Sequence, residues 1–65
     1  MKTPVTITVE LPHAEAAALA QFVKRAHFGT CERLADPSRK DEPQQMMNAL
    51  CAVQRSLAQA GYAPR

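Results

Sequence analysis

A short alternating segment near the N-terminus constrains the fold more than any other feature. From Val5 to Pro12 the sequence reads VTITVELP, with apolar residues at every second position and polar residues between them. Strict alternation predicts a half-buried β-strand. No other segment reads as a strand, so a single strand would leave its backbone donors and acceptors unpaired. We therefore expect it to pair with the same strand of a second chain, in a homodimer, or with the sheet of another protein. The predicted pairing interface consists of Val5, Thr6, Ile7, Thr8, Val9, Glu10 and Leu11.

The segment from His13 to Ala26 is predicted to be an amphipathic helix. It is rich in alanine, and its apolar residues recur every three or four positions. Glu15 lies in its first turn, and Lys24 and Arg25 lie in its last, which suits the helix dipole. Gly29 is predicted to end this helix.

A short helical turn and a polar connector are expected next. Thr30 is predicted to cap the turn CERLA, which ends at Asp36 because a residue before proline disfavours the helical conformation. Residues 37–40 then form the connector.

A second long helix is predicted to open at Asp41 and to end at Gly61. Gln44 has capping-box spacing from Asp41, and Gly61 is expected to adopt a left-handed conformation, with Tyr62 packing back on Leu57. The core-facing stripe of this helix is Met46, Leu50, Val53, Leu57 and Ala60, widened by Met47 and Cys51. Met46, Met47 and Cys51 also suit an adaptable protein-binding patch, although such residues more often belong to a core.

These elements predict an α+β fold. Residues 1–65 form a single small domain in the order strand, helix, short helix, long helix, and strand pairing between two chains completes the sheet. So small a domain buries only about 60% of its unfolded surface, and such domains usually depend on disulfides, metal or association.

Metal binding and catalysis are not expected. The zinc-ligand types are His13, His27, Cys31 and Cys51, but Gly29 interrupts the helix that would bring His27 and Cys31 together. We expect Cys51 in the core and Cys31 half-buried. No nucleophile elbow, carboxylate pair or glycine-rich phosphate loop is present. We therefore predict no enzyme activity and no cofactor.

Charge and cysteine use suggest a reduced, cytoplasmic protein. The two cysteines lack CxxC spacing, no secretory leader is recognisable, and the longest uncharged stretch, residues 43–54, is too polar for a membrane span. The net charge of +2 permits DNA binding without requiring it.

The run TITVELP, followed by an amphipathic helix and GTCER, resembles the opening of a ribbon-helix-helix repressor. In that family two first strands form a ribbon that enters the DNA major groove. The resemblance implies a dimeric DNA-binding regulator in which Thr6, Thr8 and Glu10 face the DNA. Glu10 departs from the basic residues usual there, because a carboxylate opposes the phosphate charge. Pro37 interrupts the segment where the second helix of that family should continue.

Over most of its length, through VTITVELP, ALAQFVKR and LAQAGYAPR, the chain is similar to short proteins of integrative and phage-like elements of proteobacteria. This resemblance implies an accessory protein that binds and blocks a host defence complex, in the manner of anti-CRISPR proteins. A structural or toxin–antitoxin role is the remaining alternative. The residues expected to contact such a partner are Lys24, Arg25, Phe28, Arg33, Arg39, Lys40 and Met47.

Overall fold

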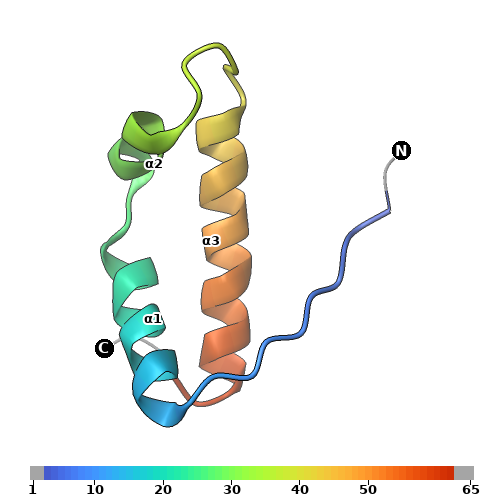
Figure 1. Ribbon diagram of the computed structural model, residues 1–65, viewed down its shortest axis with the longest axis vertical. Helices are drawn as coiled ribbons and strands as arrows, with labels where there is room; N and C mark the ends of the chain where they lie inside the picture. The colour runs from blue at the N-terminus through green and yellow to red at the C-terminus, as the bar shows by residue number, and fades with distance from the viewer. Residues whose placement is uncertain (1–2, 63–65) are drawn as a thin grey trace.

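The computed structural model describes residues 3–62 as three helices preceded by an extended segment (Figure 1). The helices are α1 (His13–Arg25), α2 (Phe28–Leu34) and α3 (Glu42–Gln59). Residues 3–12, called the arm below, have no regular secondary structure. Figure 1 shows α1 and α2 along one side of α3, with α1 and α3 antiparallel, while the arm leaves the start of α1 and extends past α3.

The predicted α+β fold is wrong, because residues 3–62 contain no β-strand and no sheet. A strand is defined by backbone pairing with another strand, and no second segment of the described chain pairs with the arm. The arm is nevertheless extended, as the alternating sequence predicted. The chain itself is therefore all-α.

The first long helix agrees with prediction to within one residue. The carbonyl oxygen of Pro12 accepts hydrogen bonds from the backbone N–H groups of Glu15 (3.0 Å) and Ala16 (2.9 Å), so the helix begins directly after the proline. The helix ends at Arg25, with Ala26 extended.

The predicted roles of Gly29 and Thr30 are wrong. His27 has an extended backbone and α2 begins at Phe28, so both residues lie inside α2. The break between α1 and α2 is made by extended residues and needs no left-handed glycine.

The two ends of α3 differ in how well they were predicted. At its start Asp41 has a helical backbone and makes no side-chain capping bond, so the predicted capping box does not form. At its end Gly61 has φ of +96°, as predicted. The N–H of Tyr62 donates to the carbonyl oxygen of Leu57 (2.8 Å), and the N–H of Gly61 donates to that of Ala58 (3.1 Å), which completes a Schellman motif.

The core is small and consists mostly of small side chains. Its buried members are Ala16, Ala20, Val23, Cys31, Ala35 and Leu57. One cluster joins Ala20, Val23 and Leu57 across α1 and α3, and it is flanked by the partly buried Leu19, Leu50, Val53 and Tyr62. The packing of Tyr62 near Leu57 is thus confirmed.

The environments predicted for the two cysteines are both wrong. Cys31 is buried, with 3% of its surface exposed, whereas Cys51 is exposed. Cys51 lies one position beyond Leu50 on α3, and one residue turns a side chain by about 100° around a helix. Ala60 is likewise exposed rather than part of the core.

Candidate binding surface beside the arm

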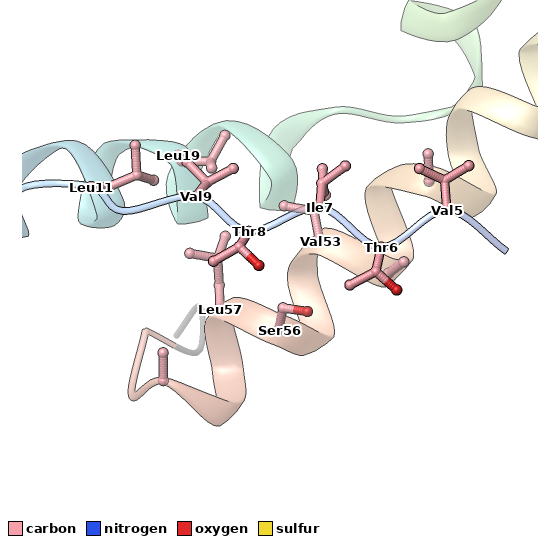
Figure 2. Close-up of a pocket in the computed structure, with 13 residues that line it drawn as sticks. Val5, Thr6, Ile7, Thr8, Val9, Leu11, Leu19, Val53, Ser56 and Leu57 are labelled. Atoms are coloured by element: carbon pink, nitrogen blue, oxygen red, sulfur yellow. The ribbon is translucent and has the colours of Figure 1, made fainter.

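The apolar side of the arm is open to solvent. Val5, Ile7 and Val9 have exposed fractions of 86%, 74% and 65%, and Leu11 is 37% exposed. Figure 2 shows Val5, Ile7 and Val9 pointing to one side of the arm, with Thr6 and Thr8 pointing to the other. The alternation that predicted a strand is therefore present in the extended backbone.

The backbone of the arm is also unpaired. Within the described chain, residues 3–11 take part in no backbone-to-backbone hydrogen bond. Backbone donors and acceptors arranged along an extended segment can pair with a second strand. The arm thus combines an apolar face with a free pairing edge.

A groove of about 950 Å³ lies between the arm and the helices (Figure 2). One wall is the arm itself, from Val5 to Val9 together with Leu11, and α1 contributes Leu19. The wall formed by α3 consists of Ala49, Ala52, Val53, Ser56, Leu57 and Ala60. Four of these six side chains are no larger than serine. The side chains of α3 therefore project little into the groove.

An aromatic contact ties the base of the arm to the end of α3. Nδ1 of His13 lies 2.5 Å from the hydroxyl oxygen of Tyr62, within hydrogen-bonding distance, and the ring centroids are 5.4 Å apart with planes inclined at 56°. His13 is the first residue of α1, directly after the arm. The contact lies at the point from which the arm departs.

Sequence reasoning missed this pair, although a signal existed. The Schellman motif places Tyr62 at the end of α3, and Pro12 places His13 at the start of α1. In an antiparallel helix pair these two ends meet.

A family model matches the sequence over residues 1–65. The chain belongs to a family of unknown function, DUF7706. Comparison with curated proteins and with solved structures gave no significant match. Because the match spans the entire chain, the arm is part of the family domain together with the helices.

The seven residues predicted to contact a partner do not line the groove. All but one are exposed, and they run from the last turn of α1 to the first turns of α3. The exposed ones are Lys24, Arg25, Phe28, Arg33, Arg39 and Lys40, and the half-buried one is Met47. Nε of Arg39 lies 3.4 Å from a carboxylate oxygen of Glu42. The carboxylate of Glu42 therefore offsets part of the positive charge of Arg39.

The loop before α3 is ordered by Asp36. Its carboxylate accepts hydrogen bonds from the backbone N–H (3.0 Å) and the hydroxyl group (2.8 Å) of Ser38. These bonds stabilise the ionised form and hold the pKa of Asp36 below its ordinary value. The backbone N–H of Asp36 donates in turn to Glu42 (3.2 Å), which joins the loop to the first turn of α3.

The residues considered for zinc binding are not gathered into a site. Among residues 3–62 there is no group of three or more His, Cys, Asp and Glu side chains placed to hold a metal ion. His13 contacts Tyr62, and Cys31 and Cys51 are both free thiols.

No helix in the described part of the chain has both the length and the apolar character needed to cross a membrane.

Proposed function

We propose that the protein is a non-catalytic binding protein that docks another macromolecule on its arm and the adjacent groove. The observation that carries this proposal is the combination in residues 5–11 of an exposed apolar face and an unpaired backbone edge. Protein binding by strand addition uses both properties, because backbone bonds supply affinity and alternate side chains supply specificity.

The surface area of the chain supports this proposal. Its accessible surface is 5629 Å², whereas a compact folded protein of 7.1 kDa exposes roughly 4,100 Å². The excess of about 1,500 Å² is ample for one side of a standard protein interface, which buries about 800 Å² per partner. The radius of gyration is 13.1 Å, against roughly 10.7 Å for a compact domain of this length.

Within this class, we propose as the specific role an inhibitor that binds and blocks a host defence complex. The resemblance to short proteins of mobile elements motivates this role, and the cytoplasm is the compartment in which it would act. Two unpaired thiols suit a reducing compartment.

A dimeric DNA-binding regulator is the second candidate. The arm continues into α1 through Pro12 alone. Two paired arms would present Thr6, Thr8 and Glu10 together on the polar face of the ribbon, opposite the face that carries the alternating apolar residues. Glu10 opposes binding there, because it would bring a negative charge to the phosphate backbone. We expect weak binding of duplex DNA by the wild type and stronger binding by Glu10→Arg. Specific affinity of about 10⁻⁸ M or better for an operator at physiological salt would favour the regulator over the inhibitor.

A pull-down from a bacterial host, analysed by mass spectrometry, tests the docking role of the arm. Ile7→Lys places a charge on the apolar face, and Thr6→Lys is the matched control, with the same new residue on the polar face of the same segment. Both positions are exposed, so circular dichroism should show unchanged helicity in each.

We expect a partner captured by the wild type to be retained by Thr6→Lys and lost by Ile7→Lys. Equal capture by the two variants would show that the apolar face of the arm is not the docking element.

A further inference from the structure

We propose that the occupant of the groove is the arm of a second copy of this chain. Two arms would pair antiparallel, centred on Thr8, and the resulting two-stranded ribbon would lie against the α3 walls of both chains. This inference rests on the proposed docking role of the arm and names its partner.

The register follows from the sequence of the arm. In an antiparallel pair centred on Thr8, Val5 lies opposite Leu11 of the second copy and Ile7 lies opposite its Val9. All seven residues from Val5 to Leu11 are paired, and every apolar residue among them faces an apolar one across the ribbon. Moving the centre by one residue in either direction keeps the polar and apolar faces apart, but only five of these seven residues then pair with one another.

Charge also favours this register. Glu10 is the only charged residue between residues 3 and 12, and it lies opposite Thr6 of the second copy. The two Glu10 side chains are then four residues apart along the ribbon, or roughly 13 Å. That separation exceeds the screening length of about 8 Å at physiological ionic strength. The pairing therefore creates no close repulsion.

The groove suits a ribbon better than it suits one arm. The chain's own arm already forms one wall, yet Val5, Ile7 and Val9 remain more than half exposed beside it. A second strand would lie about 4.8 Å from the first and double the number of apolar arm side chains along the groove. The exposed small residues Ala49, Ala52, Ser56 and Ala60 leave room for these β-branched side chains to approach the helix.

The small core gives a reason for self-association. Four of the six buried residues are alanine or cysteine, and these four lie in α1, in α2 or at the end of α2. No side chain in the described chain is completely buried. Domains of this length commonly depend on association for stability. Self-association requires no molecule other than the chain itself.

Light scattering combined with cysteine crosslinking tests the proposal. Thr8→Cys and Thr6→Cys are made in a Cys51→Ser background, which removes the exposed native thiol, while Cys31 stays buried. In the proposed register the two residues at position 8 face each other with Cβ atoms about 4.5–5.5 Å apart, close to what a disulfide requires. The two residues at position 6 are separated by roughly 13 Å and cannot be bridged.

We expect wild-type protein to scatter as a dimer at high micromolar concentration. Under mild oxidation, Thr8→Cys should double in mass on a non-reducing gel, while Thr6→Cys stays at the monomer mass. A monomer at every concentration would overturn the proposal. Equal crosslinking at positions 6 and 8 would also overturn it, because random encounter would produce that result.

Failure of this inference and failure of the proposed function give different results. A monomer that captures a host partner through Ile7 would reject the second copy and leave the docking role intact. A dimer crosslinked at position 8 that captures no host partner would support the second copy and reject the docking of a host partner.

Discussion

Replacing each of the two glycines of the chain with alanine is expected to change the stability in opposite directions. Gly61 has φ of +96°, and a Cβ atom added there would meet nothing within 4 Å. Gly29 lies inside α2, and a Cβ atom added there would lie 3.1 Å from ring atoms of His27. Alanine at position 61 therefore meets backbone strain without a clash, and alanine at position 29 meets a close side chain without backbone strain.

The expected magnitudes follow from this difference. A left-handed conformation costs a non-glycine residue about 1–2 kcal/mol, and alanine recovers about 0.4–1 kcal/mol by restricting the unfolded chain. Gly61→Ala should therefore lower the free energy of unfolding by about 1 kcal/mol. Gly29→Ala should raise it by up to about 1 kcal/mol, because alanine is the better helix former and the exposed His27 ring can turn away.

Urea denaturation of both variants at one fixed protein concentration measures these changes. For a domain of this size, 1 kcal/mol corresponds to a melting temperature shift of about 4–8 °C. Gly61→Ala should also loosen the contact between Tyr62 and His13, which depends on the Schellman motif. Wild-type stability in Gly61→Ala would refute the left-handed end of α3, and an equal loss in Gly29→Ala would mean that the His27 ring is fixed in place.

Three further predictions concern the core, the loop and the thiols. Leu57→Ala should cost on the order of 2–5 kcal/mol in denaturation, and the half-buried Leu50→Ala should cost less; the reverse order would mean that the core face of α3 is misassigned. The carboxyl of Asp36 should titrate below its ordinary pKa by NMR, so the stability that it contributes is present above the ordinary pKa and is lost as the pH falls through the lowered one. Ser38→Ala should move that pKa part of the way back, and an unchanged value would exclude the hydroxyl bond as a cause. Cys51 should react with a thiol reagent in the folded protein while Cys31 reacts only on unfolding, and Cys51→Ser should leave partner capture unchanged; fast labelling of Cys31 would contradict its burial.

Local signals in the sequence located the helices well. The ends that were predicted correctly depend on backbone constraints that act within a few residues, as at Pro12 before α1 and Gly61 after α3. Predictions that depended on competition between neighbouring conformations failed, as at Asp41, whose helical backbone removes it from a capping role. The burial of Cys31 and the exposure of Cys51 depend on which faces of α2 and α3 meet, and the pattern of one helix does not contain that information.

The arm shows how an alternating sequence led to a wrong fold class. Alternation in residues 5–11 specifies which side chains share a face, and the extended backbone retains that arrangement. It does not specify what the face contacts, because a strand obtains its partner from elsewhere in the chain or from another molecule. Within residues 3–62 no such partner exists, so the chain alone is helical with a free arm. Exposed apolar side chains cost free energy in water, and an open backbone edge is a template for a second strand. These two properties are the reason for the proposal that the arm binds another molecule.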